Sequence, residues 1–349
     1  MQPEDERLTA PLTSRRAFVR RAARLGAAVV ASGPLAGALA SCGGAPSARA
    51  PLSPTATPTT APTATPDTRP ITVAITGDVM LGRSVGQRIL STNDRFPFNG
   101  TADWLNTFDI TVGNLECVVS TLGQPQPKQY TFEAPPQGFD RLAAAGFDIV
   151  SVANNHSGDY GPVAFADMLK HLPEHGITPL GGGLNRTQAH RPIIRTVRST
   201  TIGFLAYCAI EPMSFAATAT TPGHAWLDPT LMTADIHALR PQVDFLVVFT
   251  HWGIEYHPLE SYDQEAMARV AIDAGADFVV GAHPHVIQPS STYRGKPIVY
   301  SVGNFVFDEM WGEPERRGNV LALSVQGSRL LNWSLRTSRI GDYGAPVWV

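Results

Sequence analysis

The segment Asp277-Phe-Val-Val-Gly-Ala-His283-Pro-His285 joins a short apolar run to a pair of histidines. The run has the length and composition of a buried β-strand, and Gly275 ends the helical pattern that precedes it. Side chains two positions apart in an extended chain point the same way, so both imidazole rings can face one side. The segment therefore predicts a strand that delivers two potential metal ligands at its carboxyl end.

The same arrangement recurs along residues 71–255, where apolar runs are each followed by a polar cluster. The runs are 71–76, 109–112, 147–152 and 244–250, and the clusters are Gly77-Asp78, Gly113-Asn114-Leu115-Glu116, Asn154-Asn155-His156 and His251-Trp252-Gly253-Ile254-Glu255. Helical patterns at 161–175 and 262–274 lie between the runs, which predicts an α/β fold with a largely buried sheet. Ligands of open α/β sheets bind outside the carboxyl ends of the strands, so we expect the clusters to converge.

Further along the chain, the apolar runs 298–302 and 320–324, with 330–335, have no helical pattern between them. Such runs predict added β-hairpins rather than further strand and helix alternation.

The residue types in the clusters suit a divalent cation. Carboxylate oxygens, an amide carbonyl and imidazole nitrogens are ligands for Mn, Fe, Zn or Mg, and the clusters include no cysteine that would indicate a thiolate zinc site. A carboxylate that bridges two cations would help to activate water near neutral pH and to brace a displacement at phosphorus. Asp78 is the first candidate for that bridge.

Each cluster also has a purely structural explanation. Asp78 alone could cap a turn or a helix, Asn154 and Asn155 could form a turn, and His251 could be a satisfied core histidine. The pair His283 and His285 is the strongest single signal, because packing does not require it. The remaining histidines lack a comparable context and are expected to be surface or capping residues: His171, His175, His190, His224, His237 and His257.

Six motifs occur in the order found in one known family. They are Gly77-Asp78-Val-Met80-Leu-Gly82, Gly113-Asn114-Leu-Glu116, Asn154-Asn155-His156 with Asp159 and Gly161, His251-Trp-Gly-Ile-Glu255-Tyr256, Gly275 to Val286, and Tyr300-Ser-Val-Gly-Asn304-Phe-Val-Phe-Asp308. Together they resemble the CapA family of poly-γ-glutamate capsule proteins, from about residue 71 to about residue 309. That family is similar in fold to the calcineurin-like metallophosphoesterases. The resemblance implies a sandwich of two mixed β-sheets flanked by helices, with divalent metals bound.

The resemblance also implies roles for individual residues. The implied metal ligands are Asp78, Asn155, His251, His283 and His285, with Glu116 as a ligand or an acid–base group. His156 would be the catalytic histidine that protonates a leaving group, and Glu255, a further catalytic candidate, would line the same mouth as Asn304 and Asp308.

The first motif departs from the two-metal phosphoesterases. They usually open with Asp-x-His, whereas here the third position is Met80, as it is in the CapA family. A thioether is a poor ligand for a hard cation, so the first metal would lose a ligand or take one from elsewhere, such as Glu116.

The N-terminal 70 residues predict export and attachment to a membrane. Arg15-Arg16 precedes an apolar segment that ends in Leu39-Ala40-Ser41-Cys42, which resembles a twin-arginine lipoprotein signal with Cys42 as the lipidated residue. Residues 43–70 are rich in Pro, Thr and Ala and predict a disordered tether. Residues 71–349 remain as the folded domain, on the extracytoplasmic face of the cell membrane.

Composition narrows the functional classes. The chain of 349 residues has 16% charged residues and a net charge of −3, which gives no electrostatic footprint for nucleic acid. After Cys42 only Cys117 and Cys208 remain, and the sequence does not say whether they pair, although two buried thiols are expected.

Two functional classes remain open. In the first, the protein is a metal-dependent hydrolase or transferase that acts on an envelope polymer or a phosphorylated intermediate. In the second, it is a non-catalytic component of capsule synthesis, export or anchoring that binds an anionic polymer such as poly-γ-glutamate beside membrane synthase or export proteins. A solute-binding lipoprotein is a weaker third choice. The histidine set and Glu255 favour chemistry, since a site that only binds a polyanion would use more Arg and Lys than the motifs contain, where Arg83 is the nearest.

Overall fold

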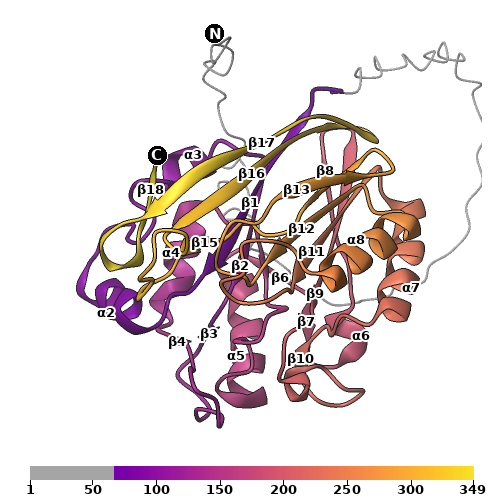
Figure 1. Ribbon diagram of the computed structural model, residues 1–349. Helices are drawn as coiled ribbons and strands as arrows, with labels where there is room; N and C mark the ends of the chain where they lie inside the picture. The colour runs from indigo at the N-terminus through magenta and orange to yellow at the C-terminus, as the bar shows by residue number, and fades with distance from the viewer. Residues whose placement is uncertain (1–66) are drawn as a thin grey trace, which may run out of the picture. The chain divides into compact units, whose positions relative to one another are not determined.

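Two mixed β-sheets lie face to face, and helices cover their outer faces (Figure 1). The computed structural model describes residues 67–349, which form one unit. The predicted export signal at 1–42, with Cys42, and most of the predicted tether at 43–70 lie outside the described residues. The predicted α/β sandwich of two mixed sheets flanked by helices is confirmed.

The larger sheet has the strand order β18-β17-β16-β1-β2-β5-β6, with β15 paired to β1. Its strands are β1 (Ile71–Val79), β2 (Ile110–Leu115), β5 (Ile149–Ser151), β6 (Thr178–Leu180), β15 (Asn304–Val306), β16 (Arg317–Gln326), β17 (Arg329–Ile340) and β18 (Pro346–Trp348). Strands β1, β2, β5 and β6 run parallel, and β16, β17 and β18 extend the sheet beyond β1 through successive antiparallel pairs. The antiparallel β16–β17 pair is the hairpin predicted from the runs at 320–335.

The smaller sheet has the strand order β13-β14-β12-β11-β9-β8. Its strands are β8 (Ile193–Val197), β9 (Thr200–Cys208), β11 (Phe245–His251), β12 (Phe278–Ala282), β13 (Ser290–Tyr293) and β14 (Lys296–Val299). Its four central strands are parallel, and β8 and β13 close its edges antiparallel. Two short ladders lie outside the sheets: β3 (Val118–Val119) with β4 (Glu133–Ala134), and β7 (Gly182–Gly183) with β10 (Gly223–His224).

Seven α-helices are described within residues 67–349. They are α2 (Arg83–Ser91), α3 (Ala102–Leu105), α4 (Gln137–Ala145), α5 (Gly161–Glu174), α6 (Arg186–Ala189), α7 (Pro229–Leu239) and α8 (Tyr262–Ala274). None of these helices combines the length and the apolar character needed to cross a bilayer. Helices α5 and α8 match the helical patterns predicted at 161–175 and 262–274, and a Ser261–Gln264 capping box begins α8.

Three apolar clusters hold these layers together. Side chains such as Ile75 of β1 and Val247 of β11 meet between the sheets and form the central cluster. The second cluster packs α2 to α5 on the outer face of the larger sheet, and the third packs α7 and α8 on the smaller one. Because each central strand is covered on both faces, its sequence is a nearly continuous apolar run, which is why these strands could be predicted.

The parallel strands bring their polar carboxyl ends to one region between the sheets. Asp78 of β1 pairs in register with Asn114 of β2 and with Asn304 of β15. His251 at the end of β11 lies beside Ala282 of β12, directly before His283. The fold therefore places polar residues from both sheets at a shared edge.

A close contact next to this edge gives a stability prediction. A methyl group on Gly281 would lie 2.1 Å from the Tyr300 carbonyl oxygen and 2.3 Å from Trp252 Nε1, which hydrogen-bond each other. We expect Gly281→Ala to lower the free energy of unfolding by about 1–3 kcal/mol, because neither neighbour can move without breaking that bond. Urea denaturation followed by tryptophan fluorescence measures the change.

Gly341→Ala is the matched control for this substitution. A methyl group there meets no atom closer than 3.5 Å, and Gly341 has a negative φ of −91°. It should leave the free energy of unfolding nearly unchanged. If Gly281→Ala and Gly341→Ala lower the free energy of unfolding equally, crowding at Gly281 is not the cause.

Candidate metal centre

Strands β1 and β2 supply two buried carboxylates and the amide between them. Asp78 Oδ1 accepts a hydrogen bond of 2.7 Å from Asn114 Nδ2. Glu116 lies two residues beyond Asn114 and therefore points to the same side, with its side chain fully buried. Its Oε1 has no hydrogen-bond partner among the described residues. A buried carboxylate oxygen without a partner is costly, so Glu116 is poised for a ligand.

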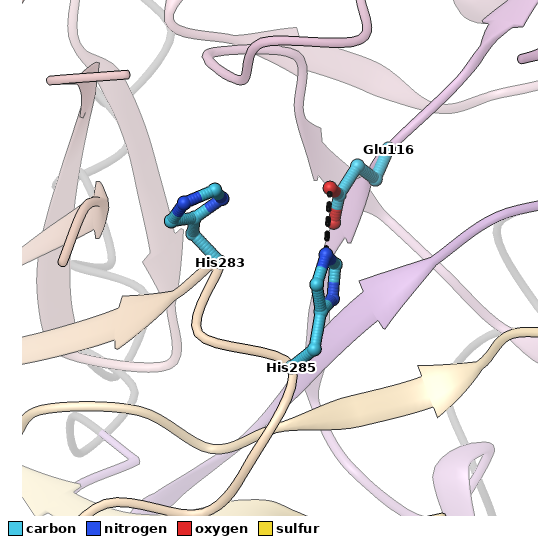
Figure 2. Close-up of side chains that lie close together, drawn as sticks. All are labelled: Glu116, His283 and His285. Carbon is cyan, nitrogen blue, oxygen red and sulfur yellow. Dashed lines mark ion pairs between the residues drawn. The ribbon is translucent and has the colours of Figure 1, made fainter. Parts of the chain in front are cut away.

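The smaller sheet supplies three buried imidazoles to the same region. His251 Nε2 lies 3.8 Å from Glu116 Oε1, and His285 Nε2 lies 3.7 Å from the same oxygen. The Nδ1 atom of His283 has no hydrogen-bond partner in the described structure, and its ring centroid lies 4.7 Å from that of His251. Figure 2 shows Glu116 and His285 facing each other, with His283 beside them.

The spacing of His283 and His285 predicted that both lie on an extended strand. The structure shows that they do not. Strand β12 ends at Ala282, and both His283 and His285 have positive φ angles, of 98° and 58°. Positive φ is uncommon for residues other than glycine and costs conformational energy, so the surrounding structure must hold this turn. A backbone hydrogen bond of 3.3 Å from His283 N to Asp78 Oδ2 is one such restraint.

Two groups of side chains have the spacing to hold a metal ion, and both contain Glu116. The groups are Glu116 with His283 and His285, and Asp78 with Glu116 and His251, in each of which the ligand atoms lie within 4.8 Å of one another. The carboxylate shared by the two groups is thus Glu116, whereas the sequence had favoured Asp78 as the bridge. The unpartnered atoms of Glu116 and His283 and the oxygen and nitrogen donor set fit a divalent cation.

Burial raises the pKa of the Glu116 carboxyl group in this cluster and lowers the pKa of two of its imidazoles. Burial, and then the nearby charge of Asp78, raise the pKa of Glu116 well above its usual value. Burial lowers the pKa of His251 and of His283 well below the usual value, so both rings are neutral. Burial would also lower the pKa of His285, but hydrogen bonding and charge from Asp78 outweigh it and raise that pKa. His251 and His283 are thus in the neutral form that binds metal, whereas the raised pKa values of Glu116 and His285 favour protonated forms, from which a bound cation would displace the protons.

The two neighbouring asparagines, Asn154 and Asn155, have different roles. Asn154 donates to the Asn114 side chain and to the Leu115 carbonyl, and it therefore holds the loop after β5 against β2. Asn155 Oδ1 lies 2.9 Å from His251 Nε2 at the cluster itself. The structure thus places Asn155 at the centre, while Asn154 has a structural role.

His156 lies beside the cluster with its ring fixed on one side. Its Nδ1 lies 2.6 Å from Asp159 Oδ2 and 3.2 Å from Lys128 Nζ, and the ring stacks on Phe132 at 4.0 Å. Burial lowers the pKa of His156 to about 4, against the opposing effect of Asp159. With Nδ1 engaged by Asp159, Nε2 is the nitrogen that is free for a substrate.

The three residues expected at the mouth have different positions. Asn304 contacts the centre, because its Oδ1 lies 2.9 Å from His285 Nδ1. Asp308 lies apart from the cluster, where it pairs with Arg83 and accepts a 2.8 Å hydrogen bond from Ser84 N. Glu255 is exposed and makes no ion pair within residues 67–349, although its charge acts on Glu116 and His285.

Met80 is turned away from the cluster. It is fully buried among the apolar residues under α2 and α4, and its sulfur accepts a 3.0 Å hydrogen bond from Gly82 N. The position of the expected second ligand in the Asp-x-His motif is therefore part of the core. Glu116, which follows β2, lies within the cluster instead.

The remaining sequence predictions concern His224, Cys117 and Cys208. His224 was expected at the surface or in a cap, and this is wrong, because the side chain is fully buried in the β7–β10 ladder and burial lowers its pKa to about 4. Cys117 and Cys208 are both free and buried, as expected. Burial raises the pKa of each thiol to about 12, so neither is reactive.

Two residues of the site were missed. Lys128 and Phe132 lie in a loop rich in Gln and Pro that has no apolar periodicity, so no local pattern connected them with His156. The only signal was the rarity of lysine, since the chain contains three. Asp159 was noticed within a motif, but its contact with His156 required the structure.

Comparison with known proteins identifies the family. A family model described as "Bacterial capsule synthesis protein PGA_cap" matches residues 72–309. The chain belongs to this family. The match covers the stretch from before Asp78 to just after Asp308, and so includes every residue of the cluster.

Two relatives have names that refer to capsule synthesis. The "Capsule biosynthesis protein CapA" of Bacillus anthracis is 31% identical over 249 residues, which cover 69% of this chain and 61% of that protein. The "PGA biosynthesis protein CapA" of Bacillus subtilis (strain 168) is 31% identical over 244 residues, which cover 69% of this chain and 64% of that protein. The chain thus spans less than two thirds of the length of these relatives, and the predicted resemblance to CapA is confirmed.

A solved structure supports the fold alone. A hypothetical protein from Thermus thermophilus matches 76% of this chain and 98% of its own, with a TM-score of 0.50 at 17% identity.

The uncompensated carboxylate predicts an unusual stability change. In the chain freed of metal by a chelator, we expect Glu116→Gln to raise the free energy of unfolding by about 1–3 kcal/mol, because it removes a buried charge. The raised pKa means that the folded protein binds this proton at higher pH than the unfolded chain, so the wild type loses stability as pH rises. The difference between the two proteins should therefore be larger at about pH 8 than at about pH 5, as measured by urea denaturation.

Adding Mn²⁺ should reverse the order of stability, since the ion stabilises the wild type through Glu116. Glu174→Gln, at an exposed position on α5, is the control; it removes only a solvent-exposed ion pair with His171 and should change little in either condition. A metal-free Glu116→Gln protein that is less stable than the wild type would contradict the picture of an uncompensated charge.

Proposed function

We propose that this protein is a metal-dependent hydrolase or transferase of capsule synthesis that acts on an anionic envelope polymer or on a phosphorylated envelope intermediate. The observation that carries the proposal is the buried, unpartnered Glu116 oxygen, surrounded by His251, His283 and His285. Structural ion pairs are normally satisfied, whereas this set leaves donor atoms open toward one another.

Six residues would hold the cation or cations: Asp78, Glu116, Asn155, His251, His283 and His285. A bound divalent cation, whether Mn, Fe, Zn or Mg, would act as a Lewis acid toward an oxygen of the substrate and would favour ionisation of water. Asn114 orients Asp78, and Asn304 orients His285, so each of these two ligands is held by a second side chain.

His156 would transfer the proton. Asp159 Oδ2 accepts a hydrogen bond from the Nδ1–H of His156, which fixes the tautomer and leaves Nε2 for the leaving group. In the absence of substrate the ring is neutral, because burial lowers its pKa to about 4. An anionic substrate beside the ring would raise that pKa again, so that His156 would become protonated when the substrate binds.

The position of Met80 favours a second candidate function. With the motif's usual histidine replaced by a core side chain, the protein could hold the cation only to bind a polyanion, as a non-catalytic export or anchoring component. The two functions differ in what His156 does, since only the first one needs its proton.

The test combines metal content with turnover in the full-length chain. We expect Asp78→Ala/His285→Ala to lose the bound divalent metal, measured by inductively coupled plasma mass spectrometry after loading with Mn²⁺. His156→Ala should keep the metal and lower kcat on an alkyl phosphodiester or on poly-γ-glutamate, whose leaving groups need a proton, by about 10²–10⁴-fold.

His237→Ala is the control, because His237 lies exposed on α7. It should match the wild type in both measurements. A wild type that retains no metal after reconstitution with manganese, zinc and iron would rule out the hydrolase. Metal retention with no turnover in any protein would favour the binding component.

We also propose that the chain is exported by the twin-arginine route and anchored in the membrane through lipid on Cys42. The lipobox-like Leu39-Ala40-Ser41-Cys42 after the Arg15-Arg16 segment supports this proposal. A lipid anchor would keep the site at the cell surface, where an envelope polymer is accessible.

Metabolic labelling with an alkyne fatty acid tests the anchor. The wild type should carry the label and sediment with membranes, and Cys42→Ala should lose both properties. Cys208→Ala, which removes a buried thiol, should keep the label. If the Cys42→Ala variant still carries the label, the lipid is not attached to Cys42 and the proposed anchor is wrong.

A further inference from the structure

A second cavity lies outside the metal centre, at the edges of the two sheets. It is a groove of about 570 Å³ between α5 and β6 on one side and β8 on the other. Arg195 of β8 donates a hydrogen bond to the Thr178 hydroxyl of β6 and thereby joins the two edge strands. None of the six motifs contributes to this groove, since its lining residues fall between 166 and 195.

The groove is positively charged in a protein that is otherwise acidic. Lys170, Arg191 and Arg195 line it, and no acidic side chain does. Residues 67–349 contain 20 basic and 27 acidic residues in total, so this grouping differs from the rest of the surface. Lys170 and Arg191 are exposed and form no ion pair within the described chain, which leaves both charges available.

The walls of the groove can also pair with a backbone. Strand β8 pairs only with β9 and so presents one unpaired edge, whereas the outward-facing residue of β6 is Pro179, which has no N–H and offers only its carbonyl. Edge strands carry free N–H and C=O groups that hydrogen-bond an extended chain containing amides. The side chains of Leu184 and Ile194 add exposed apolar surface beside these edges.

We propose that this groove binds an extended polyamide with free carboxylates, a chain of the poly-γ-glutamate type, and guides it along the molecule. This inference rests on the proposed function for the polymer, and it adds a binding site separate from the metal centre. The Arg191 guanidinium and the Lys170 ammonium match carboxylates, while Arg195 is engaged by Thr178 and the Ile194 carbonyl, and the unpaired edge of β8 matches amides. A polymer of phosphates and sugars would use the charges but would leave the edge of β8 unpaired.

The position of the groove suits a guiding role. Strand β6 runs parallel to β5, and the chain that continues from β5 carries Asn155 and His156. A polymer that lies along β6 would thus follow the direction of the strands that end at the centre. The groove and the metal centre would then contact the same polymer chain, although no residue of the protein belongs to both sites.

The test is direct binding of fluorescein-labelled poly-γ-glutamate to the full-length chain, measured by fluorescence anisotropy. The variant is Lys170→Glu/Arg191→Glu, which changes two exposed side chains without internal ion-pair partners. We expect its Kd to rise by at least about tenfold, with a steep dependence on salt in the wild type. Metal content should stay at the wild-type level.

Arg88→Glu/Arg329→Glu is the matched control, since it makes the same change in net charge at exposed positions outside the groove. Its Kd should stay within about twofold of the wild type if attraction is local to the groove. Equal weakening in both variants, or no weakening in the first, would overturn the proposal. Displacement of the probe by polyphosphate at lower concentration than by unlabelled poly-γ-glutamate would overturn the preference for a polyamide.

The result of this binding test can be distinguished from the result of the turnover test of the proposed function. Binding that depends on the groove, in a protein without turnover, would support this site and count against the hydrolase. Turnover of a phosphodiester by a wild type that does not bind poly-γ-glutamate would do the reverse.

Discussion

The constraint on which the site depends is a carboxylate buried between two sheets with one oxygen that accepts no hydrogen bond. Glu116 has an unbonded oxygen that lies within 4 Å of imidazole nitrogens from the opposite sheet. A protein can tolerate such a group only where surrounding elements are held firmly, because the free energy of desolvation must be balanced by packing elsewhere. The three apolar clusters supply that balance, and the turn at His283 to His285 is held against Asp78 by the same frame.

The layers explain why the polar residues come together. Parallel strands in each sheet end at one edge, and the central apolar cluster fixes how the two sheets pack face to face. The short bonds of Asn114 and Asn304 then orient the ligands individually. Beyond this inner layer, Lys128, Asp159 and Phe132 fix the ring of His156. The contacts that organise the centre are therefore supplied by strands and loops of both sheets.

Much of this arrangement was accessible from sequence, because strands buried on both faces give continuous apolar runs and polar residues at their ends are conspicuous. The two sheets, the long helices and the family were predicted correctly. What was missed depends on distant register. Glu116 is the shared carboxylate because Asp78 is in register with Asn114, two positions earlier, and no local pattern contains that pairing. The edge strand β8 alternates buried and exposed residues and carries an arginine, so it gave no strong apolar run. Lys128 reaches His156 through a loop whose path the sequence does not specify.

The distribution of the ligands along the chain has a consequence for biogenesis. Asp78 and His283 are 205 positions apart and contact each other across the two sheets. A nascent or truncated chain that lacks its second half can offer only part of the candidate coordination set, so high-affinity uptake of a cation there would have to follow completion of the sandwich. Metal loading would then serve as a checkpoint for finished folding: a chain that carries its ion has already assembled both halves.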